Sequence, residues 1–260
     1  MSTKRKPSRP STPTRSKPRV VAAYVHPAEV SAWFMHSWDN LRSYDNGHHQ
    51  HLVTRLSMVS SANISGTRNK IVRAFLDDYP DADWLWWLDA DMVFEPDTLD
   101  QLLTNADPDK APIVGGLCFG IDRNGAGDGQ LFPTLFALQR DENDPTKTAM
   151  ANYKDYPPNA MFGVSATGSA CILIHRRVLE AVRDHGFNSS YPWYQETELS
   201  GKPCSEDITF CIRAALLGFP TYVDTGVPIG HHKSWVLTED QYLKQRREEL
   251  AAATSHDREA

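Results

Sequence analysis

The stretch WLWWLDADMVFEPDTLDQLL, residues 84–103, constrains the fold more than any other part of the chain. It begins with five apolar residues, a length typical of a strand and too short for a helix. The absence of polar alternation favours a strand buried on both faces, as in a sheet covered by helices. Pro96 then predicts the start of a helix with Leu99, Leu102 and Leu103 on one face.

Asp89 and Asp91 lie at the end of this predicted strand, where open α/β sheets bind ligands. Two carboxylates would repel a nucleotide diphosphate unless a hard divalent cation, Mg²⁺ or Mn²⁺, bound both sets of oxygens. The same spacing occurs at Asp81-Ala82-Asp83 and Asp107-Pro108-Asp109, but only the copy at Asp89 follows a buried apolar run. The alternative interpretation is that these aspartates cap the following turn or helix.

Four further segments accompany this strand in a fixed order. GTRNKIVRAFL (66–76) precedes it, and ATGSACILIHRRVLEAV (166–182), SEDITFCIRAALLGF (205–219) and VPIGHHKSW (227–235) follow it. Taken with the Asp-x-Asp strand, they resemble the GT-A fold glycosyltransferases, particularly the family-2-like group. The resemblance covers residues 20–235, most of the chain.

The resemblance implies a fold and an activity. The fold is a GT-A-like three-layer α/β/α sandwich with a mixed, mainly parallel sheet, expected over residues 20–235. The activity is transfer of a sugar from a nucleotide-sugar donor to an acceptor hydroxyl, with Mn²⁺ or Mg²⁺ as cofactor. The sequence leaves the sugar, the nucleotide and the acceptor open; the acceptor is a protein, a glycan or a nucleic acid. It also leaves open whether the reaction inverts or retains the anomeric configuration.

The resemblance also assigns candidate site residues. Asp89 and Asp91 would bind the metal ion, together with a histidine of the late loop, either His231 as first choice or His232. Lys233 would meet the phosphates as a point charge. The remaining nucleotide-contacting candidates are Tyr24, Val25, His26, Pro27, Arg68, Asn69 and Asp89, of which Arg68 and Asn69 fall on the more polar side of a helix expected over 67–76.

The segment from Ser205 to Gly218 predicts the most regular helix of the chain, with Ser205 as its N-cap. Glu206 and Asp207 lie in its first turn, a position that the helix dipole alone favours for acidic residues. In inverting members of the family, a carboxylate at this helix start is the catalytic base. The resemblance therefore makes Asp207 the candidate base and Glu206 a candidate for orienting the acceptor.

Histidines cluster at His48, His49 and His51, beside the turn signal Asn46-Gly47. They lack the i, i+4 spacing of a helical metal site, so a solvated loop is favoured over metal binding. A helix is expected before them, over 28–41, and a strand after them, over 52–59. Residues 140–162 are expected to form a variable insertion beside the acceptor.

Charge is unevenly distributed. Residues 1–19 contain seven Lys or Arg, no acid and four prolines, whereas the remaining residues carry 20 basic and 33 acidic side chains. Such an arm cannot bury a core and is expected to be disordered. It is either an electrostatic tether to nucleic acid or another polyanion, or a solubilising tail. At the other end, residues 236–260 are expected to form a charged surface helix and a tail.

The four cysteines show no zinc-binding spacing, which favours reduced, mostly buried thiols. No apolar run approaches the ~18 residues of a membrane helix, and no hydrophobic stretch follows the basic N-terminal residues. A cytoplasmic location without a membrane span is therefore expected.

Two rival functions come from other classes. One is a related metal-dependent nucleotidyltransferase, which would release pyrophosphate. The other is nucleic-acid binding through residues 1–19, against which the acidic body argues. A combined hypothesis is glycosylation of modified DNA, with the basic arm guiding the enzyme.

Overall fold

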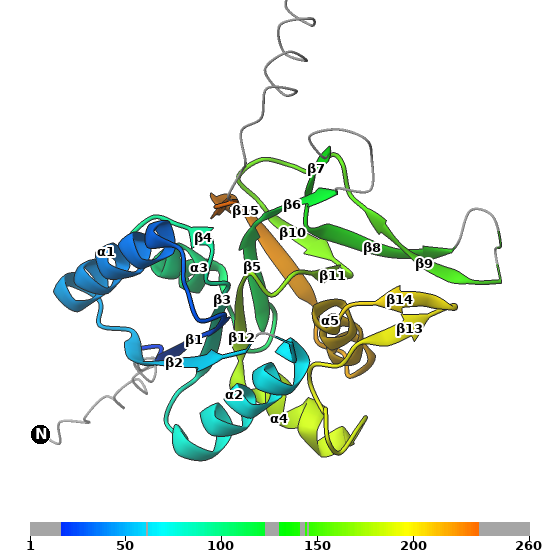
Figure 1. The fold of residues 1–260 in the computed structure, drawn as a ribbon, viewed down its shortest axis with the longest axis horizontal. Helices are drawn as coiled ribbons and strands as arrows, with labels where there is room; N and C mark the ends of the chain where they lie inside the picture. The colour runs from blue at the N-terminus through cyan, green and yellow to red at the C-terminus, as the bar shows by residue number, and fades with distance from the viewer. Residues whose placement is uncertain (1–16, 61, 123–129, 141–143, 145, 234–260) are drawn as a thin grey trace, which may run out of the picture.

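The computed structural model describes residues 17–60, 62–122, 130–140, 144 and 146–233 (Figure 1). Residues 123–129, most of the basic arm, and the helix and tail expected over 236–260 lie outside these described residues. Among the described helices, none is long and apolar enough to cross a membrane. The four cysteines are free and buried, as predicted.

A seven-stranded sheet in the order β10-β15-β5-β12-β3-β1-β2 forms the centre of the molecule (Figure 1). β1, β2 and β3 are parallel neighbours, and so are β5 and β15. β12 separates the two groups and is antiparallel to both β3 and β5, so five strands share one direction. The sheet is therefore mixed, as expected. Its strands are β1 (Val20–His26), β2 (Leu52–Val59), β3 (Trp84–Leu88), β5 (Ile113–Leu117), β10 (Met161–Val164), β12 (Cys171–His175) and β15 (Thr221–Pro228).

Helices cover both faces of this sheet, as β3 illustrates. Trp84, Trp86 and Leu88 pack on one face, against α1 and α3. Leu85 and Trp87 pack on the other face, against α2, α4 and α5. The all-apolar sequence of β3 thus reflects burial on both sides, and the predicted three-layer α/β/α arrangement is confirmed. The helices are α1 (Ala32–His48), α2 (Ile64–Asp78), α3 (Thr98–Asn105), α4 (Arg176–His185) and α5 (Glu206–Leu216).

Smaller sheets lie beyond the main one. The region expected to be a variable insertion contains a strand, β9, which pairs with β8 in a three-stranded sheet. The smallest sheet, β4 with β16, joins the segment after β3 to the late histidine loop. The strands of these sheets are β4 (Met92–Val93), β6 (Phe119–Asp122), β7 (Gln130–Pro133), β8 (Leu135–Arg140), β9 (Thr148–Asn152), β11 (Ala166–Thr167), β13 (Thr197–Leu199), β14 (Lys202–Cys204) and β16 (Gly230–His231).

The end of α1 differs from the prediction. The helix starts four residues later than expected and runs through the Asn46–Gly47 pair that predicted a turn, so His48 is helical. The carboxylate of Asp45 accepts hydrogen bonds from the backbone N–H groups of His51 and Leu52, at 2.7 and 3.1 Å. These contacts determine where the helix ends. They outweigh the preference of Asn-Gly for a turn, which is only a weak tendency.

Two further helix predictions need correction. The helix expected from Pro96 begins at Thr98, because Pro96 lies in the preceding turn. In α5 the helical spacing predicts a buried stripe of Ile208, Cys211, Ile212, Ala215 and Leu216, but Leu216 is 71% exposed. The helix instead turns Phe210 inward, where its ring stacks on Tyr194 with the centroids 5.1 Å apart.

Candidate functional site

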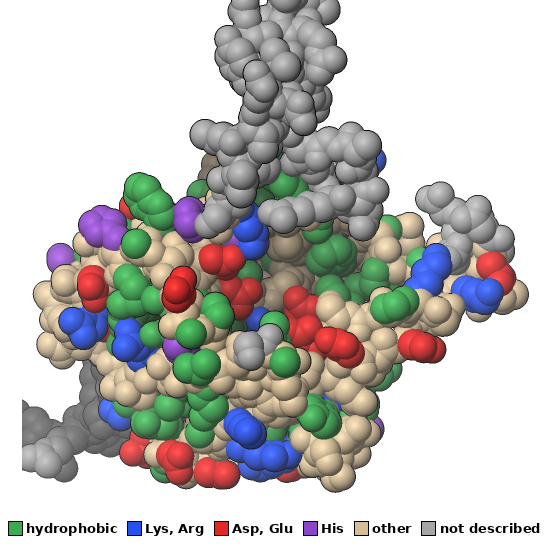
Figure 2. Space-filling view, viewed as in Figure 1, with side chains coloured by type: hydrophobic (Ala, Val, Ile, Leu, Met, Phe, Trp, Pro, Cys, Tyr) green, Lys and Arg blue, Asp and Glu red, His purple; other side chains and the backbone are tan. Residues whose placement is uncertain are grey.

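A cavity of about 750 Å³ opens at the carboxyl ends of β1, β2 and β3. The space-filling view shows acidic side chains gathering near the middle of this face, with basic and histidine side chains close by (Figure 2). The structure brings nine of the predicted site residues into the wall of this cavity. They are Val25, His26, Pro27, Arg68, Asp89, Asp91, His231, His232 and Lys233.

Asp91 is held between two cationic groups from the late loop. Its Oδ2 atom lies 3.0 Å from Nε2 of His231 and 2.9 Å from Nζ of Lys233. Burial opposes ionisation of Asp91, but the hydrogen bonds from His231 and Lys233 outweigh it and lower its pKa to about 2. Asp91 is therefore an ionised carboxylate at neutral pH.

The pairing of β4 with β16 brings the late loop to Asp91. His231 pairs with Met92 in this ladder, and the backbone N–H of His232 donates to the carbonyl of Asp91 at 2.8 Å. A Cβ atom at Gly230 would lie 3.2 Å from Cβ of Val93, so a glycine permits this close approach. The glycine before the histidines thus has a packing role.

The ring of His231 has a fixed orientation. Its Nδ1 lies 2.8 Å from the carbonyl oxygen of Phe119, which only accepts hydrogen bonds, so Nδ1 carries a proton and Nε2 faces Asp91. Burial lowers the pKa of His231, but its contacts with Asp91 and Phe119 outweigh burial and raise it overall. His232 points elsewhere, with Nδ1 3.1 Å from Oγ of Ser31.

Arg68 connects the two acidic parts of the site. Its Nη2 lies 3.0 Å from Oδ1 of Asp89, and its Nε lies 3.7 Å from Oε1 of Glu206. The guanidinium lies over the rings of Trp87 and Tyr194, with 5.3 and 5.5 Å to the ring centroids. Burial would lower the pKa of Arg68, but the charges of Asp89 and the other acidic groups around it together outweigh burial and raise the pKa.

Arg68 and Asn69 were expected on the polar side of their helix, and that expectation is wrong, since both are buried. Asn69 lies away from the cavity wall. Its Nδ2 donates to the carbonyl of Tyr194 at 2.7 Å, and its Oδ1 accepts from the N–H of Trp193 at 3.2 Å. The side-chain amide of Asn69 therefore links the segment containing Trp193 and Tyr194 to α2.

Glu206 and Asp207 start α5 beside the cavity. Oδ1 of Asp207 accepts hydrogen bonds from the N–H of Ile208, at 2.8 Å, and from the hydroxyl of Ser205. Ser205 is the N-cap residue, as predicted, but its side chain makes this contact instead of capping the helix. Oδ2 of Asp207 lies 3.4 Å from the position that a Cβ on Gly168 would occupy. Burial, reinforced by the charge of Asp207, raises the pKa of Glu206 above its usual value.

Tyr24, in β1, does not line the cavity, whereas several residues after β1 and β2 do. Tyr24 is buried, with its ring edge-on to Phe34 at 5.0 Å, so it supports the cavity from the core. Glu29, Ser31 and Ser60 line the cavity but were not anticipated. The available signal was topological, because these residues follow β1 and β2 at the edge where parallel strands end.

The chain was compared with protein families and solved structures. The family model described as glycosyltransferase like family 2 matches residues 46–253. No curated protein matches the chain. GalNAc-T7, solved with UDP, GalNAc and Mn²⁺, is 10% identical, with a TM-score of 0.56 over 84% of this chain and 44% of that one.

Two other structures are more distant in shape. A197 from STIV is 16% identical with a TM-score of 0.49, over 83% of this chain and 86% of that one. A glycosyltransferase involved in glycosylation of the major capsid of PBCV-1 is 12% identical with a TM-score of 0.35, over 66% and 69%.

Proposed function

Because the chain belongs to the glycosyltransferase-like family 2, and is thus a glycosyltransferase of GT-A fold, we propose that it uses a nucleotide-sugar donor, an acceptor hydroxyl and a divalent metal ion. The observation that supports this proposal most strongly is the single cavity at the strand ends. It unites the Asp-x-Asp carboxylates with Arg68, His231 and Lys233, which are the groups that a metal-bound diphosphate requires.

The donor set around Asp91 fits Mn²⁺ or Mg²⁺. Oδ2 of Asp91 and Nε2 of His231 lie 3.0 Å apart. Neighbouring ligands of an octahedral ion with bonds of ~2.0–2.1 Å are separated by about 2.9 Å. Asp91 and His231 would hold the ion, with Asp89 as a further candidate, whereas His232 is turned to Ser31. The ion, when bound, stabilises negative charge on the leaving diphosphate.

The residues proposed to bind the donor lie around the Asp91–His231 pair, in the wall of the same cavity. Arg68 and Lys233 supply positive charge for the phosphates, and Arg68 still has two buried nitrogen atoms, Nε and Nη1, that form no hydrogen bond with the described residues. Val25, His26 and Pro27, directly after β1, are the proposed contacts of the nucleotide base.

Asp207 is the proposed catalytic base of an inverting reaction. Its Oδ1 accepts hydrogen bonds from Ser205 and Ile208, while Oδ2 lies beside Gly168, which carries no side chain. In this scheme Oδ2 takes the proton of the acceptor hydroxyl as that oxygen bonds to the anomeric carbon. The bond from this carbon to the diphosphate breaks, and its electrons leave with the diphosphate. Glu206 is proposed to orient the acceptor.

A donor panel tests the proposal. The full-length protein is incubated with UDP-, GDP-, dTDP- and CMP-linked sugars in Mn²⁺ and then in EDTA, starting with UDP-GalNAc and Mn²⁺ because the GalNAc-T7 structure holds UDP, GalNAc and Mn²⁺. We expect slow release of the nucleotide from one donor, lost in EDTA. No release and no nucleotide binding across the panel would overturn the proposal.

We also propose that residues 1–19 contact a polyanion, on the basis of their seven basic and no acidic residues. The test compares DNA binding by the full chain and by a chain lacking residues 1–19, at ~50 and ~200 mM salt. We expect salt-sensitive binding that the deletion abolishes. Equal binding by both chains would contradict this role.

A further inference from the structure

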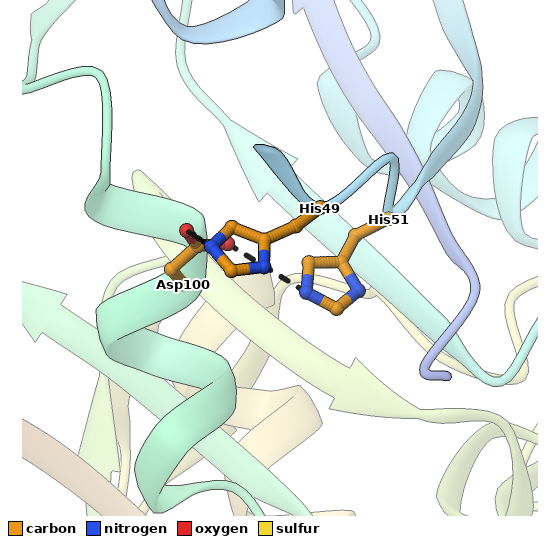
Figure 3. A group of neighbouring side chains, drawn as sticks. All are labelled: His49, His51 and Asp100. Carbon is orange, nitrogen blue, oxygen red and sulfur yellow. Dashed lines mark ion pairs between the residues drawn. The ribbon is translucent and has the colours of Figure 1, made fainter. Parts of the chain in front are cut away.

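Three potential metal ligands meet at the far end of α1 from the cavity. His49 and His51 extend from the segment between α1 and β2, and both rings reach toward Asp100 in the first turn of α3 (Figure 3). Nε2 of His49 lies 3.1 Å from Oδ2 of Asp100, and Nε2 of His51 lies 3.6 Å from Oδ1. One ligand atom from each residue lies within 4.8 Å of the other two.

Asp100 is incompletely satisfied in this group. Its Oδ2 is buried and forms no well-aligned hydrogen bond with the described residues; Nε2 of His49 lies 3.1 Å away, and the hydroxyl of Tyr44 also lies near the carboxylate. A buried carboxylate oxygen without a well-aligned partner is costly. A cation shared by the oxygen and the imidazole nitrogen removes that cost.

The ring of His51 is oriented as in a metal site. Its Nδ1 lies 3.0 Å from the carbonyl oxygen of Pro18, which accepts a hydrogen bond but cannot donate one. Nδ1 therefore carries a proton, and Nε2 faces Asp100. A metal-binding histidine almost always donates its other ring N–H to a carbonyl or carboxylate in this way.

The backbone holds the two histidines together before any ligand binds. Gln50, between them, has a φ of 54°, in the left-handed region that non-glycine residues rarely adopt. The buried carboxylate of Asp45 anchors the N–H groups that follow, including that of His51 at 2.7 Å. The rings of His49 and His51 are stacked, with centroids 5.5 Å apart and 10° between planes.

We propose that His49, His51 and Asp100 bind a transition metal ion of the Zn²⁺ class through the two Nε2 atoms and the carboxylate of Asp100. Nitrogen and oxygen ligands at ~2.0–2.2 Å in tetrahedral geometry are about 3.3–3.5 Å apart. The separation of 3.1 Å from His49 to Oδ2 and that of 3.6 Å from His51 to Oδ1 lie on either side of this range. The side chain of His49 is 48% exposed, which leaves room for water as the fourth ligand.

This site is separate from the proposed catalytic one. Ala32, the first residue of α1, lines the cavity, and the 17 residues of the helix span roughly 25 Å before His49. The ion ties the end of α1 and the start of β2 to α3, so its role is to stabilise the fold.

The test measures Zn²⁺ binding and thermal unfolding of the full-length protein. His49→Ala, at an exposed position, and Asp100→Asn remove ligands; His48→Gln, one residue away, and Asp91→Asn are controls. We expect Zn²⁺ to raise the Tm of the wild type and both controls, and the Kd to rise at least tenfold in the two ligand variants. Circular dichroism checks that these variants are folded. A wild-type Kd in the ligand variants, a loss confined to Asp91→Asn, or no micromolar binding by the wild type would overturn the proposal.

Discussion

Nε2 of His231 lies 3.0 Å from Oδ2 of Asp91, although 140 residues separate them in the chain. The pairing of β4 with β16 brings the two residues together. Lys233, from the same loop as His231, contacts the same oxygen of Asp91. An Asp-x-Asp tripeptide is common, and this chain contains three. What distinguishes the copy at Asp89 is that distant histidine and lysine side chains converge on it.

The Asp91 contacts predict an acid-dependent stability. Folding lowers the pKa of Asp91 from 3.8 to about 2. The ionised carboxylate therefore stabilises the folded protein fully at a pH above the unfolded-state pKa, and this stabilisation is lost as the pH falls toward the folded-state pKa. Without added metal, we expect the difference in unfolding free energy between wild type and Asp91→Asn to shrink from pH 5 to pH 3. Urea titrations at both pH values measure it, and a constant difference would contradict the prediction.

Arg68 should be important for stability as well as for the site. Arg68→Ala leaves Asp89 and Glu206 without their shared cation, and breaking a buried ion pair costs about 3–5 kcal/mol. We expect about 3 kcal/mol, because the side chain of Asp89 is 38% exposed and remains partly hydrated. Arg73→Ala on the same helix is the control, with an expected loss of at most ~1 kcal/mol. Equal losses in urea denaturation would argue against this role for Arg68.

Asp207→Asn should slow the chemical step without weakening nucleotide binding. The amide oxygen can still accept the hydrogen bond from Ile208, so the fold is retained, but it cannot take a proton. We expect donor hydrolysis to fall about 10²–10⁴-fold, with nucleotide Kd changed by no more than about twofold. Glu198→Gln, at an exposed position, should leave both unchanged. Wild-type turnover in Asp207→Asn would remove it as the base.

The sequence predicted best where one local pattern had only one physical solution. The uninterrupted apolar run of β3 required burial on both faces. A glycine directly after a helical segment predicts a left-handed C-cap, and Gly186 ends α4 in that conformation. The burial of Arg68 was harder to predict, because a charged side chain on a helix is expected to face solvent unless its partners are known. Trp87, Tyr194 and Asp89 all reach it from other elements.

The histidine cluster shows the same limit. The local spacing of His49 and His51 favoured a solvated loop over a metal site. Asp100, which faces them, lies on α3, and no spacing rule connects that helix to the end of α1. Likewise, only the fold shows that His231 meets Asp91 whereas His232 meets Ser31.

The most direct test of the proposed metal-dependent transfer compares Asp91→Asn with Asp81→Asn. Asp81 starts another Asp-x-Asp copy and is exposed in a turn. Nucleotide release from the productive donor is measured in Mn²⁺ for the wild type and both variants. We expect Asp91→Asn to lose at least about 10²-fold in rate, an effect of ~2.7 kcal/mol on the barrier, and Asp81→Asn to match the wild type. Mn²⁺-dependent release by Asp91→Asn at the wild-type rate would contradict the site assignment.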